Sequence, residues 1–400
     1  MSGDSPVQRY RIATLNEIAR RGLERFPLDR YALGGPLEGA DAIILRSHDL
    51  TSTAIPASVK AIGRAGAGTN NIPVPAMSSR GVPVFNAPGA NANAVKELVL
   101  SAMLMAARNI VPALHYVASL DPADPQLEAR VEAGKKTFAG FELPQRTLGI
   151  IGLGAVGSLV ADTAIKLGMN VIGFDPEITV DAAWRLPASV RKAHSIEEVL
   201  RHADMVSLHV PLVPMTRRLI DEKRLAAVKQ GGVLLNFARE AIVDEAAVGA
   251  ALRDGRLRAY ICDFPTSTLL RERNVVALPH LGASTAEAEE NCAEMVVDSV
   301  RAFLEDGTIR NAVNFPQVEM PREAPYRVAI ANANVPNMLG QISSTMAHGG
   351  LNIHNMVNKS RGEMAYTLVD VDSAVDEATI RAIAAIAGVL SVRAIPAEVD

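Results

Sequence analysis

The glycine motif at residues 152–157, Gly-Leu-Gly-Ala-Val-Gly, constrains the fold of this chain more than any other feature. It follows directly after an apolar run, residues 147–151, and opens a stretch with helical periodicity. Gly152 permits a tight turn, Gly154 lets a pyrophosphate approach the backbone, and Gly157 allows close packing of helix on strand. Free N–H groups at the start of the helix favour the phosphates. The motif therefore predicts a Rossmann-type unit that binds a dinucleotide.

An aspartate at the end of the next predicted strand supports this interpretation. Asp175 follows the motif by about 20 residues, where an acid accepts hydrogen bonds from the ribose hydroxyls. A carboxylate there repels a 2′-phosphate, so NAD is favoured over NADP. The alternative is a glycine turn in any α/β domain, and the flanking strand and acid argue against it. The predicted cofactor site also includes the motif residues Ala155 and Val156.

Short apolar runs alternate with helix-like stretches through the first three quarters of the chain, a pattern typical of βαβ units and parallel sheets. A polar, proline-bearing segment, Asp121 to Leu143, is predicted to be a surface connection between two sheets. A buried helix is expected from Asn93 to at least Leu104, and a long helix from Thr285 to Glu305. The predicted strands are 41–45, 61–65, 82–85, 147–151, 171–174, 205–209, 233–236, 259–263 and 275–277.

Residues 319–324 carry prolines and charges and are predicted to be a linker to a further unit. Beyond them, strands are expected at 326–331, 351–356, 365–371 and 389–395, and helices at 336–348 and 377–386. That βαββαβ order predicts a ferredoxin-like domain.

Composition excludes several other classes of protein. The 400 residues predict two or three domains, and a formal net charge of -4 gives no general attraction to nucleic acid or anionic membranes. Only 4% of residues are aromatic, which disfavours a base-stacking surface. No apolar run approaches the length of a membrane span, and residues 1–11 lack the layout of a signal peptide. Cys262 and Cys292 form neither a disulfide framework nor a metal cluster, so we expect a cytoplasmic protein without a metal.

Two residues just past predicted strands suit the oxidation of a hydroxy acid. Arg239 follows the strand at 233–236, and a guanidinium can hold a substrate carboxylate through two hydrogen bonds. His280 follows the strand at 275–277, and an imidazole can accept and return a hydroxyl proton near neutral pH. Either residue alone is more often structural. Their occurrence at successive strand ends of one predicted sheet favours a catalytic pair.

These residues resemble the D-2-hydroxyacid dehydrogenase family, and within it the phosphoglycerate-oxidising members that carry a C-terminal ACT regulatory domain. The resemblance covers nearly the whole chain and rests on residues 46–47, 66–72, 86–91, 152–157, 236–245 and 279–285. It implies a flavodoxin-like substrate domain at 1–91 and 286–318, an inserted Rossmann cofactor domain at 92–285, and a ferredoxin-like ACT domain at 325–400. The catalytic cleft is expected between the first two.

The resemblance implies roles for individual residues. Arg239 corresponds to the family's substrate-binding arginine and His280 to its acid/base residue. Residues that hold the phosphorylated substrate or face its carboxylate correspond to Arg46, Ser47, Gly66, Gly68 and Asn91. The cofactor site gains His209, Pro211, Ala238, Asp263 and Gly282, with Asp263 matching the acid that contacts the nicotinamide carboxamide.

The chain departs from the family where a glutamate usually pairs with the histidine. The run after Asp263 is Phe-Pro-Thr-Ser-Thr, which is one residue short and contains no carboxylate. Glu272 is the next acid along the chain. Either Asp263 serves both roles or His280 works without a carboxylate. Glu240 is a second departure, since the family commonly has glycine there.

The ACT resemblance points to Asn332, Asn334 and Asn352 as a serine site between two paired domains. Asparagine can hold an amino acid through donors and acceptors together, although it is equally common in turns and caps. The implied function is NAD-dependent oxidation of 3-phospho-D-glycerate, the first step of serine biosynthesis, by a homodimer or homotetramer. Two alternatives stay open: a reductase of glyoxylate, hydroxypyruvate or another D-2-hydroxy acid, and a non-catalytic NAD-sensing protein.

Overall fold

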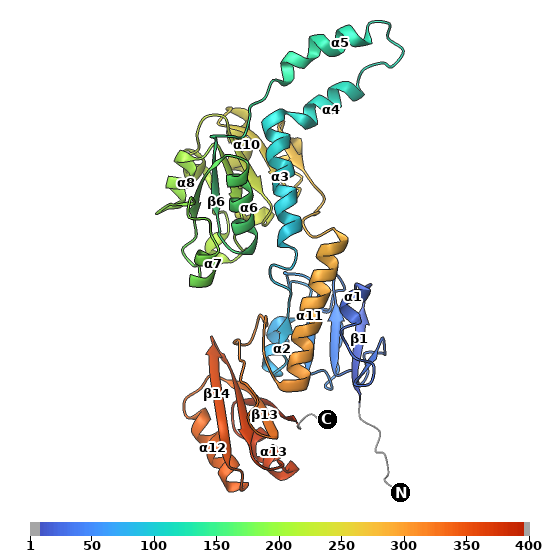
Figure 1. The fold of residues 1–400 in the computed structure, drawn as a ribbon, viewed down its shortest axis with the longest axis vertical. Coiled ribbons are helices and arrows are strands. Elements are labelled where there is room, and N and C mark those ends of the chain that lie inside the picture. The colour runs from blue at the N-terminus through green and yellow to red at the C-terminus, as the bar shows by residue number, and fades with distance from the viewer. Residues whose placement is uncertain (1–8, 396–400) are drawn as a thin grey trace. The chain divides into compact units, whose positions relative to one another are not determined.

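The computed structural model describes residues 9–395 (Figure 1). The first eight residues of the predicted substrate domain and the last five of the predicted ACT domain lie outside this range. The chain divides into two compact units, one formed by residues 1–91 together with 286–400 and the other by residues 92–285.

The unit of residues 92–285 is built on a seven-stranded parallel sheet in the order β12-β11-β10-β9-β6-β7-β8. Read from β8 to β11, this is the Rossmann order, and the order reverses between β6 and β9, where such sheets bind their ligands. The strands are β6 (Thr147–Ile151), β7 (Asn170–Phe174), β8 (Arg191–Lys192), β9 (Met205–Leu208), β10 (Gly232–Asn236), β11 (Leu257–Cys262) and β12 (Val275–Ala277).

Helices cover both faces of this sheet (Figure 1). Alternate strand residues face α3 (Ala92–Arg108) and α6 (Ala155–Lys166) on one side. The others face α8 (Ile196–His202) and α10 (Glu245–Arg253) on the opposite side. Burial on both faces explains why the central strands β6, β9 and β10 are largely apolar rather than alternating. The short helices α7 (Val180–Trp184) and α9 (Glu222–Leu225) complete the unit.

The segment from Asp121 to Leu143 lies at the surface as predicted, but it contains helix that the sequence pattern did not indicate. The segment contains α5 (Leu127–Gly134) and a 3-10 turn at Lys135–Phe138, which pair with α4 (Ile110–Ala118). The Tyr116 ring lies 5.4 Å from the Phe138 ring, and its hydroxyl donates to the Arg130 carbonyl. No residue of α5 is buried, so the helix has no apolar stripe that a periodicity argument could detect.

The other unit contains a five-stranded parallel sheet in the order β2-β1-β3-β4-β5. This is the flavodoxin-like order. The strands are β1 (Tyr10–Leu15), β2 (Tyr31–Leu33), β3 (Ala42–Leu45), β4 (Ala61–Arg64) and β5 (Val84–Phe85), with short helices α1 (Arg20–Leu23) and α2 (Val74–Ser79). The long helix α11 (Ala286–Asp306) returns to this sheet and buries Val296, Val297 and Val300 against it.

The C-terminal part of the same unit has the predicted βαββαβ order. Its four antiparallel strands run β14-β15-β13-β16, which is the ferredoxin-like arrangement. The elements are β13 (Tyr326–Ala333), α12 (Met338–His348), β14 (Ile353–Arg361), β15 (Met364–Val371), α13 (Glu377–Ala384) and β16 (Val389–Ile395). The predicted fold class is therefore confirmed.

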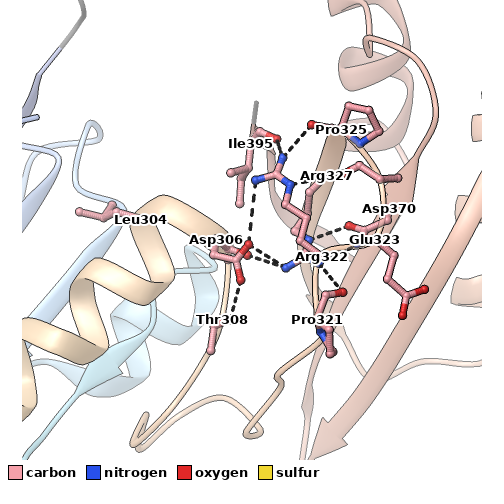
Figure 2. Close-up of polar contacts among 12 residues, drawn as sticks. Leu304, Asp306, Thr308, Pro321, Arg322, Glu323, Pro325, Arg327, Asp370 and Ile395 are labelled. Carbon is pink, nitrogen blue, oxygen red and sulfur yellow. Dashed lines mark hydrogen bonds and ion pairs between the residues drawn. The ribbon is translucent and has the colours of Figure 1, made fainter. Parts of the chain in front are cut away.

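A buried arginine connects this antiparallel sheet to the end of α11 (Figure 2). Arg327 on β13 and Asp370 on β15 have no exposed side-chain surface, and Arg327 Nε donates to Asp370 Oδ1 at 2.6 Å. Arg327 Nη1 donates to Asp306 Oδ1 at 2.9 Å, and Arg327 Nη2 donates to the Pro321 carbonyl. Arg322 donates to the Ile395 carbonyl. The predicted linker is thus packed against the sheet that follows it.

Candidate active site

The glycine loop between β6 and α6 has the shape that a dinucleotide requires. Gly152 adopts φ +93°, and a Cβ there would lie 2.5 Å from the His209 carbonyl oxygen. A Cβ on Gly157 would lie 2.0 Å from the Gly152 carbonyl oxygen, so helix and loop touch at this point. At Gly154 a Cβ would meet nothing within 4 Å, which leaves open space at the N-terminus of α6. This cradle fits a pyrophosphate on the helix N-terminus.

Asp175 stands next to the cradle at the end of β7. Its Oδ2 accepts from Leu153 N at 2.8 Å and its Oδ1 accepts from Glu177 N at 2.9 Å. Each carboxylate oxygen retains a second lone pair for a ribose hydroxyl. The acid predicted from sequence is therefore placed beside the glycine loop.

His209, which follows β9, lies at the same edge of the sheet. Its Nε2 lies 2.8 Å from the Ser207 hydroxyl, and removal of the ring from water lowers the pKa of His209 to about 4. The ring is therefore neutral near pH 7. Pro211 is the second residue after it and its carbonyl accepts from the Thr216 hydroxyl. His209 therefore lies against the glycine loop as a neutral ring rather than as an acid/base group.

The loop that carries Arg239 is held by a buried asparagine at the end of β10. Asn236 has no exposed surface, accepts from Ala238 N, and donates to the Arg239 carbonyl and the Tyr260 hydroxyl. Arg239 is half-buried, and its Nη1 donates to the Ala238 carbonyl at 2.6 Å. Its remaining N–H groups are available for a substrate carboxylate.

Asp263 anchors the loop that carries His280. Its buried carboxylate accepts from Leu281 N at 2.7 Å and from Gly282 N at 2.8 Å, and its carbonyl accepts from His280 N at 3.1 Å. Burial raises the pKa of Asp263, while the two backbone donors oppose that rise. A Cβ on Gly282 would lie 3.1 Å from Asp263 Oδ2, so glycine suits this close approach.

No carboxylate binds the His280 ring within residues 9–395. Both oxygens of Asp263 are directed at backbone N–H groups, and Glu272 forms an ion pair with Arg253 on α10. The exposed imidazole instead contacts Phe264, with ring centroids 4.6 Å apart. Sequence reasoning offered Asp263 as a partner for the ring and did not identify Phe264.

The residues matched to substrate binding lie in the other unit, on loops at the carboxyl end of its parallel sheet. Arg46 and Ser47 follow β3, Gly66 and Gly68 follow β4, and Asn91 ends the loop after β5. A Cβ on Gly66 would lie 2.4 Å from Arg64 Nη1.

Arg46 is paired with an acid that the sequence pattern did not reveal. Its Nη1 lies 2.6 Å from Glu289 Oε1 on α11, and the two side chains are 33% and 41% exposed. Arg64 Nε donates to the Arg46 carbonyl, and both arginines act electrostatically on the buried Cys292. Two guanidinium groups and one carboxylate therefore share this edge of the sheet.

The three asparagines predicted to bind serine do not gather in one copy of the chain. Asn332 lies near the end of β13, buried, and its Oδ1 has no hydrogen-bond partner among the described residues. Asn334 follows and donates to the Gly362 carbonyl. Asn352 precedes Ile353, which pairs through Val371 with Tyr326 at the other end of β13.

The described part of the chain contains neither a metal-binding group nor a single helix that could span a membrane. No group of three His, Cys, Asp or Glu residues there could hold a metal ion. No single described helix is long and apolar enough to cross a membrane; α3 and α4 together pass that test of length and composition but are bent by 68°.

Comparison with known proteins identifies the family. Residues 100–282 match the model of the D-isomer specific 2-hydroxyacid dehydrogenase NAD-binding domain. A D-3-phosphoglycerate dehydrogenase of Haemophilus influenzae is 35% identical over 86% of this chain and 84% of its own length. One from Methanocaldococcus jannaschii is 35% identical over 84% of this chain, which spans 62% of that relative.

A solved structure supports the same assignment. The NAD⁺-bound 3-phosphoglycerate dehydrogenase of Entamoeba histolytica is 26% identical, covers 76% of this chain and 99% of its own, and has a TM-score of 0.60. Sequence, sheet topology and the glycine cradle agree. The chain belongs to the D-isomer specific 2-hydroxyacid dehydrogenase family and is an NAD-binding enzyme of that family.

Proposed function

We propose that this enzyme oxidises 3-phospho-D-glycerate to 3-phosphohydroxypyruvate with NAD, the first step of serine biosynthesis. The observation that carries dehydrogenase chemistry is the placement of Arg239 and His280 on strand-end loops of the sheet that holds the glycine cradle. The phosphorylated substrate is supported by the relatives' names and by Arg46 and Arg64, whose guanidinium groups suit a phosphate.

The residues of this chain divide the reaction between them. Arg239 binds the substrate carboxylate through its free N–H groups and orients the hydroxyl-bearing carbon. The imidazole of His280 accepts the hydroxyl proton as the C–H bond breaks. When NAD is bound on the glycine cradle and Asp175, its nicotinamide ring supplies the hydride acceptor. In the reverse direction His280 returns the proton and Arg239 polarises the 2-oxo acid.

The alternatives make different predictions for substrate and for turnover. A reductase of glyoxylate or hydroxypyruvate needs no cation for a phosphate, whereas Arg46 and Arg64 provide two. A non-catalytic NAD sensor needs neither Arg239 nor His280, and both follow strands of the sheet that also carries the glycine cradle.

The test is loss of NADH absorbance with phosphohydroxypyruvate, hydroxypyruvate and glyoxylate side by side. We expect the highest kcat/KM for phosphohydroxypyruvate, and we expect His280→Ala to lose most of that activity. Far better turnover of hydroxypyruvate would replace the phosphoglycerate assignment with the reductase. Equal rates for wild type and His280→Ala would remove His280 from the mechanism.

Assembly and regulation belong to the same proposal. Helix α4 exposes Leu114 and Val117, at 62% and 55%, which supports a homodimer through the cofactor domain. The free acceptor on Asn332 supports serine binding between two C-terminal domains, with Asn352 contributed by the second copy. Both cysteines are buried free thiols, which fits the cytoplasm.

A further inference from the structure

We propose that Phe264 is a positioning residue for catalysis, and that its ring fixes the His280 imidazole in the absence of a carboxylate partner. The inference rests on the proposed function, in which His280 is the acid/base residue. Phe264 immediately follows Asp263 in the shortened segment after β11.

One aromatic ring contacts both catalytic side chains. The centroids of the Phe264 and His280 rings are 4.6 Å apart with an interplanar angle of 50°. The Arg239 Cζ lies 5.2 Å from the centroid of the same ring. The three residues come from loops after three adjacent strands, β10, β11 and β12. Phe264 therefore links the proton acceptor to the group that binds the substrate carboxylate.

The backbone of His280 is fixed, but its side chain has no polar partner within the described residues. His280 adopts φ +57°, which is uncommon for a residue other than glycine. Hydrogen bonds from His280 N, Leu281 N and Gly282 N to Asp263 hold that conformation. The imidazole makes no hydrogen bond to any group of residues 9–395, so the contact with the Phe264 ring is what restricts its orientation.

The Phe264 ring also favours the protonated form of His280 electrostatically, as the glutamate that is missing here would do. The face of an aromatic ring attracts a cation within about 6 Å of its centroid, and more strongly where water is excluded. It therefore favours the imidazolium that forms when His280 accepts the hydroxyl proton. The charged groups around this ring pair are Asp263, which interacts electrostatically with His280, and Arg239, which contacts the Phe264 ring.

The experiment compares Phe264→Leu with Phe264→Tyr and measures His280 directly. The two-dimensional ¹H–¹³C NMR signal of its Cε1–Hε1 group, assigned by its loss in His280→Ala, is followed from pH 5 to 9. We expect Phe264→Leu to move the titration midpoint to lower pH by about half a unit. Phe264→Tyr keeps an aromatic ring and is expected to keep the wild-type midpoint.

Phe141→Leu is the matched control. The Phe141 ring, in the same unit, contacts the guanidinium carbons of Arg146 and Arg258 at 5.1 and 5.2 Å but does not contact His280. Phe141→Leu also removes a contact between an aromatic ring and a guanidinium group, and it is expected to leave the titration midpoint of His280 unchanged. In turnover of whichever 2-oxo acid the enzyme accepts, we expect kcat to fall about tenfold in Phe264→Leu, with unchanged NADH affinity.

Identical titration midpoints in wild type and Phe264→Leu would overturn the inference, as would an equal shift in Phe141→Leu. The NMR measurement needs no turnover. A shifted midpoint in a protein that reduces no 2-oxo acid would thus refute the proposed function and leave the contact between Phe264 and His280 established.

Discussion

Glu289 is predicted to weaken the attraction of Arg46 for a phosphate, and Glu289→Gln removes its charge with little change of shape. In the structure the carboxylate lies 2.6 Å from Arg46 Nη1. A phosphate bound to the same guanidinium would come within about 5 Å of that carboxylate, because both anions would contact one planar group.

The size of the effect follows from Coulomb's law. Both side chains are about one-third or more exposed, so the dielectric constant of water applies. The repulsion between the Glu289 carboxylate and one unit of negative charge about 5 Å away is then roughly 0.8 kcal/mol. A phosphate monoester carries close to two charges at pH 7, which gives roughly 1.5 kcal/mol, or about tenfold in kcat/KM.

The assay is the ratio of kcat/KM for phosphohydroxypyruvate to that for hydroxypyruvate. We expect Glu289→Gln to raise this ratio about tenfold at low salt and less at high salt, where the charges are screened. Glu290→Gln is the matched control, because Glu290 is on the same helix and pairs with Arg21 instead. A ratio that stays constant or falls in Glu289→Gln would refute the reasoning, as would an equal rise in Glu290→Gln.

Three further predictions concern single residues. Arg239→Ala should lower kcat/KM about a thousandfold while calorimetry shows unchanged NADH binding; lost binding would contradict its assigned role. Asp370→Ala should lower the urea-measured free energy of unfolding by about 3 kcal/mol, since it leaves the buried Arg327 with only the partly exposed Asp306 as a carboxylate partner; a loss below about 1 kcal/mol would contradict this. The pKa of His209 is lowered from 6.5 to about 4, so the unfolded chain binds a proton at this residue more readily than the folded protein does. The free energy of unfolding is therefore unaffected by this group above pH 6.5 and decreases as the pH falls from 6.5 toward 4. His209→Asn should reduce this acid-induced loss of the free energy of unfolding by up to about 3 kcal/mol. An equal dependence of that free energy on pH in wild type and His209→Asn would contradict the prediction.

Local patterns predicted much of the fold. The strand at Thr147–Ile151 and the one at Val275–Ala277 have the predicted limits, and α11 is displaced from its predicted range by one residue at each end. These elements are apolar runs, buried in β6 and partly buried in β12, or a long amphipathic helix, for which sequence pattern is informative. By contrast, α5 exposes every face and gives no such signal.

The contacts that shape the site depend on residues distant in sequence. Glu289 meets Arg46 only because α11 returns to the first sheet, and Phe264 meets His280 and Arg239 because three strand ends are adjacent. A sequence motif identifies the glycine cradle because its partners are local. It does not reveal which distant side chain replaces a missing one.

Calorimetric titration of the folded protein with NADH and NADPH measures cofactor binding without requiring turnover. NADH is expected to bind at the glycine cradle, and NADPH is expected to bind more weakly because Asp175 repels the 2′-phosphate. Asp175→Asn should reduce the difference in affinity between the two cofactors. A folded protein that gives no heat with NADH, or that binds NADPH as tightly as NADH, would show that the glycine loop and Asp175 do not form an NAD site.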